Sequence, residues 1–510
     1  MHGPSDFLDY EPVTRLRRKK STITEADDFQ SPLPMGGSEQ DRATHRETKG
    51  KAGSRELSEK DFTPAASLTN SRTKENKSWL LKRGHGISYA GLFLFTVVLY
   101  FRPYELFPSL HWLSTSAFWI AVATLAIFIP TQLMLENRLT ARPREVNLVL
   151  LLTLTALLSI PLAIRPGEAW NTFNDSFIKA VLIFIIMVNA VRTESRLRWL
   201  IYLSVLVGVV LSANAINDYR LGNLTVEGYR VKGLIGNLFG NPNDMAIHLV
   251  MMFPITVGLM MASRNLIARA VFLISALLLV MGTMLTYSRG GFLGLVMAGV
   301  VLSWKLGRRN RAIVLVLTLV VLIGFVLVAP GNYGLRILSI FDHSLDPVAS
   351  ASNRQEILMR SVIVALRHPL LGIGMGNFHI MSVHELVNHN SYLQVATEMG
   401  ATAMVLYILF TVTPLKRLRR LERETISQPK YSGVHYLAIG LQASLLSYMV
   451  TSFFGSVAYL WYVYYLVGYS VCLSRIYPLE GELGSSMSTL HRKIIPDDLP
   501  SHSEVAHGFD

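Results

Sequence analysis

The chain has 510 residues, of which 51% are hydrophobic and only 16% are charged, and it contains a single cysteine. A water-soluble chain carries about 25% charged residues, so this composition is typical of a membrane protein. One cysteine excludes a disulfide framework and a cysteine-based metal site, because each needs two or more thiolates. The net charge of +13 would indicate nucleic acid in a soluble protein. In a membrane protein Lys and Arg instead mark cytoplasmic loops, and we expect no nucleic-acid partner.

Residues 1–85 differ in composition from the rest of the chain. They are rich in Ser, Thr, Gly, Pro and charges of both signs, with a basic cluster at 15–20. Their apolar surface is too small to offset the entropy lost on ordering, which predicts a disordered tail. No apolar segment of a signal peptide follows Met1, and the basic cluster favours a cytoplasmic N-terminus.

Apolar runs of about 15 to 23 residues follow from Ile87 onward, and this is the length that a helix needs to cross a bilayer core. They predict an all-α, polytopic integral membrane protein. We expect about 12 transmembrane helices, at 87–102, 112–134, 146–164, 173–191, 197–215, 244–262, 266–286, 290–304, 312–329, 391–413, 434–454 and 457–476.

These runs divide the chain into segments. Helices one to nine fall within 86–329, and helices ten to twelve fall within 391–477. The long connection 330–390 is predicted to be a periplasmic loop subdomain with a short helix at 353–366, because connections of this length are often functional. The last segment, 478–510, is predicted to be a cytoplasmic tail.

The distribution of Lys and Arg supports an even number of spans with both termini in the cytoplasm. Most loop cations fall in loops on the side of the N-terminus, as the positive-inside rule requires. The short loops of the other side hold only five cations, which are Arg165, Arg220, Arg230, Lys232 and Arg289. These outer-side cations need a separate explanation.

Arg289 lies in a short turn, Tyr287–Gly291, in which two glycines follow the arginine. Glycines let the backbone and a ligand approach closely, and a guanidinium binds phosphate with two hydrogen bonds, so we interpret Arg289 as an anion-binding residue. Arg230 and Lys232 lie in the loop before the sixth helix. For these two, extension of the side chains to lipid headgroups remains an alternative.

The segment 236–244 begins the sixth helix and contains Asn241, Asn243 and Asp244. Asn and Asp cap helices, so we expect Asn243 and Asp244 to form the N-terminal cap, where an anion could also bind. The glycine-rich segment 372–377 resembles a phosphate loop but lacks the Gly-Lys-Ser/Thr ending, which favours a turn.

His389 and Asn390 lie at the junction of the long loop and the tenth helix. A single histidine is more often structural, but on the side of Arg230 and Arg289 its imidazole could take a proton from a hydroxyl. We interpret Glu398 as a buried partner of another helix. Asn241, Asn243 and Asn390 are predicted to cap helices and support the site.

Other features have structural explanations. Asp175 and Lys179 are spaced to neutralise each other on one helical face, although a proton or ion path would use such groups too. The aromatic residues at 459–469 are interpreted as packing and interface anchors, with a sugar-binding platform as the alternative. We find no metal-ligand cluster, serine nucleophile elbow or nucleotide motif, and we expect no metal and no cofactor.

Four segments then follow one another in a particular order: Tyr229–Arg230 leading to 240–243, Thr286–Gly291, His368–Gly374 with Asn377, and His389–Leu393 ending at 398–400. Together with the large outer loop, they resemble the O-antigen ligase and O-antigen polymerase superfamily of bacterial envelope glycan enzymes. The resemblance extends over about residues 87 to 476.

This resemblance implies a glycosyltransferase of polysaccharide or lipopolysaccharide biosynthesis in the bacterial inner membrane. It implies that a glycan leaves an undecaprenyl-diphosphate carrier on the periplasmic face and is transferred to an acceptor hydroxyl. Arg230 and Arg289 match the arginines held to bind the diphosphate, with Lys232 beside them. His389 matches the histidine thought to activate the acceptor.

The acceptor is left open, because ligases, polymerases and protein O-oligosaccharyltransferases share these motifs. It could be lipid A core, a growing glycan or a protein. A rival from another class is a glycolipid or polysaccharide transporter, favoured by the number of helices and by the Asp175–Lys179 pair. Transporters tend to have related halves, and the sequence contains no such repeat.

Overall fold

The computed structural model describes residues 85–106, 108–225, 229–234, 236–307, 316, 350–382 and 386–494. The described residues are mostly helical and contain no β-strand, which confirms the predicted all-α class. The predicted tail before residue 85, the predicted helix at 312–329 apart from residue 316, and the first part, 330–349, of the predicted loop 330–390 lie outside these ranges.

Eight helices among the described residues are long and apolar enough to cross a membrane. They are α4 (Ser116–Glu136), the continuous run Pro166–Ala190 through α6 (Pro166–Thr172) and α7 (Ile178–Ala190), α8 (Glu194–Leu221), α10 (Pro242–Ala262), α11 (Leu266–Leu285), α12 (Arg289–Leu306), α18 (Ala401–Thr425) and the run Pro429–Phe454 around α19 (Ser432–Thr451). The apolar helix α2 (Gly86–Phe101) is shorter, and α5 (Arg144–Ser159) is also short. The total of about twelve stays a prediction.

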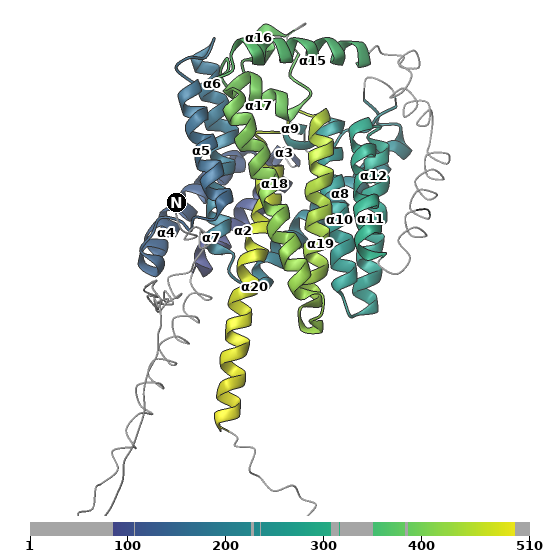
Figure 1. Ribbon diagram of the computed structural model, residues 1–510. Helices are drawn as coiled ribbons and strands as arrows, with labels where there is room; N and C mark the ends of the chain where they lie inside the picture. Colours follow the sequence, from purple (N-terminus) through teal and green to yellow (C-terminus); the bar gives the residue numbers. More distant parts are fainter. Residues whose placement is uncertain are drawn as a thin grey trace, which may run out of the picture. The chain divides into compact units, whose positions relative to one another are not determined.

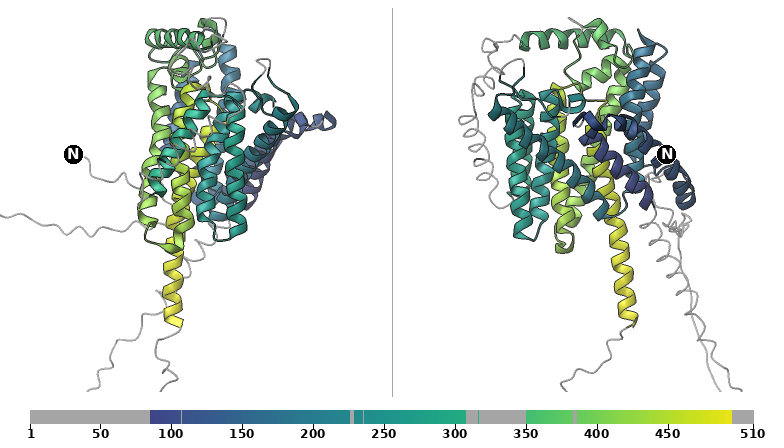
Figure 2. Two further views of the ribbon diagram at one scale, coloured as in Figure 1. Left: turned by 90° about the vertical axis from the view of Figure 1, so that its right-hand side faces the viewer. Right: turned by 180° about the vertical axis from the view of Figure 1, so that it is seen from behind.

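The helices form one bundle in which segments distant in sequence lie side by side (Figures 1 and 2). Helix α10 packs on α11, α12 and α19, and α18 packs on both α19 and α5. Near the C-terminal end of α10, the backbone meets α19 closely, because a Cβ atom on Gly258 would lie 2.7 Å from the carbonyl oxygen of Tyr436. This close pairing fixes α10, whose N-terminus carries part of the site described below.

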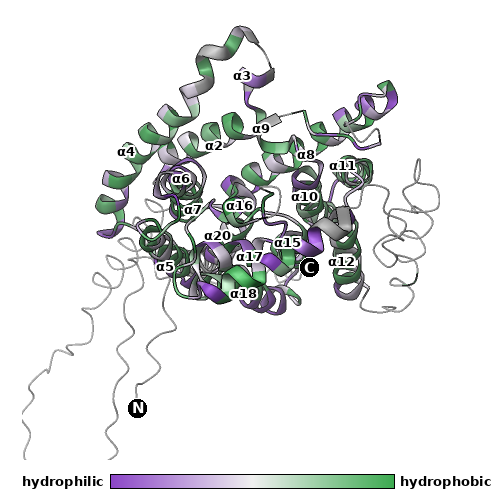
Figure 3. Cartoon of the chain, turned by 90° about the horizontal axis from the view of Figure 1, so that it is seen from above, coloured by the Kyte–Doolittle hydropathy of each residue, from purple (hydrophilic) through white to green (hydrophobic). Residues whose placement is uncertain are grey.

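The outside of the bundle is apolar, as expected for a lipid-facing surface. Helix α4 lies at one edge when the chain is seen from above (Figure 3). Phe118 and Trp119 on α4 are 56% and 64% exposed, and Leu266 and Ile267 on α11 are 76% and 74% exposed. Such contiguous exposed apolar residues are uncommon on soluble proteins, so the exposure supports a multi-pass membrane protein.

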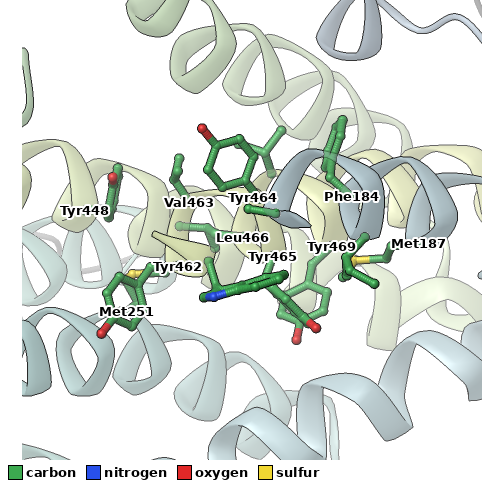
Figure 4. Close-up of a cluster of buried hydrophobic side chains, with 14 of the residues drawn as sticks. Phe184, Met187, Met251, Tyr448, Tyr462, Val463, Tyr464, Tyr465, Leu466 and Tyr469 are labelled. Atoms are coloured by element: carbon green, nitrogen blue, oxygen red, sulfur yellow. The ribbon is translucent and has the colours of Figure 1, made fainter. Parts of the chain in front are cut away.

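The tyrosines of the last helix, α20 (Trp461–Ile494), pack inside the bundle (Figure 4). Tyr462, Tyr464, Tyr465 and Tyr469 are each at most 2% exposed. Each hydroxyl has a hydrogen-bond partner, for example Ser204 Oγ at 2.7 Å from the Tyr469 hydroxyl. Paired hydroxyls remove the cost of burying these groups. The packing interpretation therefore holds for these four residues, and a sugar-binding platform does not.

The prediction of one helix over 391–413 is wrong. Helix α17 (Ser391–Met399) ends at Gly400, whose φ of +90° breaks the helix before α18 begins at Ala401. A Cβ atom on Gly400 would overlap the carbonyl oxygen of Leu370, and the Ala401 N–H donates to the Pro369 carbonyl at 2.8 Å. The break is imposed by this contact with a distant loop.

Two further elements differ in length from the prediction. Helix α20 begins at Trp461 and continues to Ile494, so part of the predicted tail 478–510 is helical. The predicted short helix at 353–366 is confirmed as α15 (Ser350–Arg367), which lies across one end of the bundle (Figure 1) and packs on α17. We call this end the α15 end.

Asp175 and Lys179 form the predicted pair, with 3.6 Å between Oδ1 and Nζ. Their side chains are 70% and 44% exposed, and the pair lies where a single π-helical turn interrupts the α6–α7 run. A pair on the outside of the bundle does not form an internal ion path, and this location weighs against the transporter alternative.

Candidate active site

Arg230 is buried and joins three segments of the chain. Its Nε donates to the carbonyl oxygen of Thr286 at 2.9 Å, and its Nη2 donates to Oδ1 of Asn243 at 2.9 Å. The neighbouring backbone is also held, because the Val231 N–H donates to the Leu285 carbonyl at 3.1 Å. Arg230 thus connects its own loop to the end of α11 and the start of α10. A buried, hydrogen-bonded guanidinium does not extend to lipid headgroups, whereas Lys232 from the same loop is exposed.

The cap of α10 is Asn241, not Asn243 and Asp244 as the sequence predicts. Oδ1 of Asn241 accepts the N–H of Asn243 at 2.9 Å, and Pro242 occupies the first helical position. Asn241 is the cap because its backbone has the extended conformation of the residue before a helix, whereas Asn243 and Asp244 lie within the helix. The side chain of Asn243 is therefore available to receive the hydrogen bond of Arg230.

Arg289 is the first residue of α12, and Ser288 caps this helix by accepting the Gly291 N–H at 3.2 Å. The two glycines allow close contact with neighbouring segments. A Cβ atom on Gly290 would lie 2.8 Å from Cβ of Phe454, and one on Gly291 would lie 2.9 Å from Cβ of Ala246 in α10. The N-terminus of α12 therefore packs against α10 and Phe454, and Arg289 is partly exposed there.

His389 directly precedes the capped N-terminus of α17. As predicted, Asn390 caps this helix, because its Oδ1 accepts the N–H groups of Tyr392 at 2.9 Å and Leu393 at 3.1 Å. Ser391 fixes the position further, since its Oγ donates to the Gly455 carbonyl at 2.6 Å. Burial, assisted by the charge of Arg354, lowers the pKa of His389 to about 4. The ring is therefore neutral at neutral pH and can accept a proton.

A polar pocket of about 230 Å³ brings several of these residues together. Its lining comes from the start of α10, the turn before α16 (Phe378–Met381), α17 with the residues before it, and the segment after α19: Asn241, Asn243, Asp244, Gly376, Phe378, His379, Val387, Asn388, His389, Gln394, Glu398, Phe454, Gly455 and Ser456. Arg230 reaches the pocket wall through Asn243, and the glycine after Arg289 packs on Phe454. The two arginines, Lys232 and Asn390 do not line the pocket themselves.

Glu398 was predicted to be a buried partner of another helix, and its partner is instead a turn. The carboxylate is 3% exposed and accepts the N–H of Gly376 at 2.9 Å. Burial raises the pKa of Glu398 to about 7, although this hydrogen bond acts in the opposite direction. The turn 372–377 is the predicted glycine turn, with positive φ at Gly372, Gly374 and Gly376.

The sequence did not single out His379, which lines the same pocket. Its Nδ1 lies 2.8 Å from the Gly376 carbonyl oxygen, and its Nε2 lies 3.5 Å from Oε2 of Glu168 in α6. Its only signal in the sequence was its closeness to the glycine turn. Among the described residues, no group of His, Cys, Asp and Glu could hold a metal ion.

The bundle and its pocket define a multi-pass membrane protein with a polar site at the α15 end. Residues 274–408 match the family model described as O-Antigen ligase, and this match supports the predicted resemblance to the O-antigen ligase superfamily. Three of the four motifs fall inside the match, and the one at 229–243 precedes it. The match supports a membrane glycosyltransferase of the O-antigen ligase or polymerase type. No curated protein matches this chain.

Proposed function

We propose that this protein transfers a glycan from an undecaprenyl-diphosphate carrier to an acceptor hydroxyl. The observation that carries the proposal is the pocket in which His389 lies beside the N-terminus of α10, itself hydrogen-bonded to the buried Arg230. In a membrane protein with an O-antigen ligase domain, a neutral base next to a cation suits transfer from a lipid diphosphate.

Arg230, Arg289 and Lys232 bind the diphosphate in this proposal. The leaving diphosphate gains negative charge as its bond to the sugar breaks, and fixed guanidinium groups stabilise that charge. Arg289 is at the first position of α12, where the positive end of the helix dipole adds to its charge. Arg230 already has its direction set by Thr286 and Asn243, so little reorganisation is needed on binding.

His389 acts as the general base. The acceptor oxygen gives its proton to the neutral imidazole while it forms a bond to the anomeric carbon of the donor glycan. The bond from that carbon to the diphosphate oxygen breaks, and the diphosphate leaves with the electron pair. Direct displacement of this kind predicts inversion at the anomeric carbon.

We further propose that the α15 end faces the periplasm of a bacterial cell and that both termini are cytoplasmic. The loops between α4 and α5, α7 and α8, α10 and α11, and α18 and α19 lie at the opposite end (Figure 1). These loops and the helix ends beside them contain most of the cations that flank the predicted spans, and such cations are retained on the cytoplasmic side. A periplasmic site has no nucleotide supply, which agrees with a lipid diphosphate as the donor.

The test is glycan transfer by purified protein in proteoliposomes that contain an undecaprenyl-diphosphate glycan. Separate reactions offer lipid A core, a second lipid-linked unit or a protein as acceptor. A single addition indicates a ligase, and a ladder of products indicates a polymerase. Glycosylated protein indicates an O-oligosaccharyltransferase.

Variants then test the assigned residues. Arg289→Ala and His389→Ala should each abolish transfer while the protein remains folded in the membrane. Arg220→Ala is the matched control, because Arg220 is exposed at the C-terminal end of α8 and takes no part in the site. Near wild-type transfer by either site variant would overturn the assigned mechanism, and loss of transfer in the control would point to a general charge effect.

A further inference from the structure

A second histidine and two charged neighbours lie in a series from the pocket to the surface. His379 lines the pocket and is 30% exposed, and its neighbour Glu168 is 40% exposed. Glu168 also pairs with Arg165, which is 58% exposed, at 2.8 Å. Exposure rises along this series, so the three side chains lead outward from the pocket wall.

The backbone fixes the meeting of His379 and Glu168. Gly376 has a φ of +73°, and a Cβ atom at this position would overlap Oγ1 of Thr172, so the turn passes directly against α6. On its other side, the Gly376 N–H is held by the buried carboxyl of Glu398. The position of the His379 ring is therefore determined by contacts on both sides of one glycine.

The proposed reaction requires such a path, because one proton is released for each bond formed. Burial and Arg354 lower the pKa of His389 to about 4. At pH 7 only about one ring in a thousand is protonated at equilibrium. His389 therefore accepts the proton during transfer but does not retain it, and the proton must leave the pocket before the next turnover.

We propose that His379 and Glu168 carry this proton from the pocket to the solvent, an inference that rests on the proposed transferase function. A water molecule takes the proton from His389 and delivers a proton to Nε2 of His379. With Nδ1–H directed to the Gly376 carbonyl, Nε2 is the nitrogen that remains to accept a proton.

The protonated ring then has a partner for each N–H, the Gly376 carbonyl and the Glu168 carboxylate. Bulk water at the exposed edge of this pair removes the proton. The ring returns to its neutral form, and one proton has been moved for each glycosidic bond.

Kinetics of the reconstituted full-length protein test this relay. His379→Ala should lower kcat by at least about 10-fold with little change in the KM for the lipid-linked donor, which is less than the roughly 10²- to 10⁴-fold contribution of a general acid or base because His389 itself remains. Added imidazole should restore much of the kcat of this variant, because the free base fills the space left by the ring. A group that only holds the turn would not be replaced by a proton carrier.

His379→Gln separates the two roles further. The glutamine amide can donate to the Gly376 carbonyl but cannot take up a proton, so kcat should fall as in the alanine variant, without rescue by imidazole. His368→Ala is the control, because His368 is an exposed histidine outside the pocket. The relay is overturned if His379→Gln keeps wild-type kcat or if imidazole leaves the alanine variant unchanged.

Two further outcomes are decisive. If neither His379 variant is folded in the membrane, Glu168→Gln becomes the test of the relay. An unchanged kcat in Glu168→Gln would overturn it. If wild-type protein and the His368→Ala control transfer no glycan, the proposed function itself fails. If the wild type transfers glycan and the His379 variants keep full activity, only the relay is refuted and the proposed function stands.

Discussion

Replacing Asn243 tests whether the buried arginine is an oriented part of the site. In Asn243→Ala the guanidinium of Arg230 loses its 2.9 Å hydrogen bond to Oδ1. The bond to the Thr286 carbonyl remains, so the side chain stays nearby but is free to rotate. The α10 cap is unaffected, because Asn241 uses only the backbone N–H of residue 243.

The expected size of the effect follows from the lost bond. A hydrogen bond to a charged group contributes about 1.5–3 kcal/mol, which corresponds to a decrease of about 10- to 150-fold in kcat/KM for the lipid-linked donor if orientation is lost in the transition state. Arg230→Ala should lower kcat/KM further, because it removes the phosphate contact as well. If Asn243 acts through the arginine and not by its own place in the pocket wall, the double variant should be no worse than Arg230→Ala alone.

The assay is initial-rate transfer in proteoliposomes, with thermal unfolding as the control for stability. Asn265→Ala is the matched variant, because Asn265 caps α11 at the opposite end of the bundle. It should cost about 1 kcal/mol of stability, as a lost cap does, without changing kcat/KM. Wild-type kcat/KM in Asn243→Ala, or effects of the two single variants that multiply in the double variant, would refute the orienting role.

Three other outcomes can be measured. As the pH falls, kcat/KM should decline near pH 4, because the base must be deprotonated and the pKa of His389 is lowered to about 4; an unchanged kcat/KM from about pH 5 down to about pH 3 in the pH–rate profile would contradict this. Glu136→Ala should lower the free energy of unfolding by about 3–5 kcal/mol, because it leaves the buried Arg192 unpaired, whereas Glu424→Ala in an exposed pair should cost less than about 1 kcal/mol in the same melting experiment. Gly400→Ala should lower Tm, since the position has a φ of +90° and no room for Cβ; an unchanged Tm would show that the break can relax.

Much of the helical fold could be predicted from apolar runs, because a bilayer requires about 20 apolar residues in each spanning helix. Helices α10 and α11 agree with the predicted ranges to within two residues at each end. The break at Gly400 could not be predicted, since it depends on contact with the Leu370 carbonyl in a distant loop. The apolar pattern continues through the break and gives no sign of it.

The candidate site shows the same division between local and distant causes. The sequence singles out Arg230 and His389 because ionisable groups are rare on the side of the membrane whose loops carry few cations. The hydrogen bond between Arg230 and Asn243 and the contact between His379 and Glu168 had no local signal. Both depend on how loops fold back against the ends of helices, which residue spacing within one segment does not encode.

The motifs of the superfamily have a common physical basis in the ends of helices. Asn241, Ser288 and Asn390 each cap a helix, and these helices are α10, α12 and α17. The starts of α10 and α17 border the pocket, and the start of α12 packs on α10 and Phe454. Helix N-termini attract anions through unpaired N–H groups and the helix dipole. Two of them at the pocket and a third packed behind it favour a ligand that gains negative charge during the reaction, and the diphosphate of the proposed lipid carrier is such a ligand.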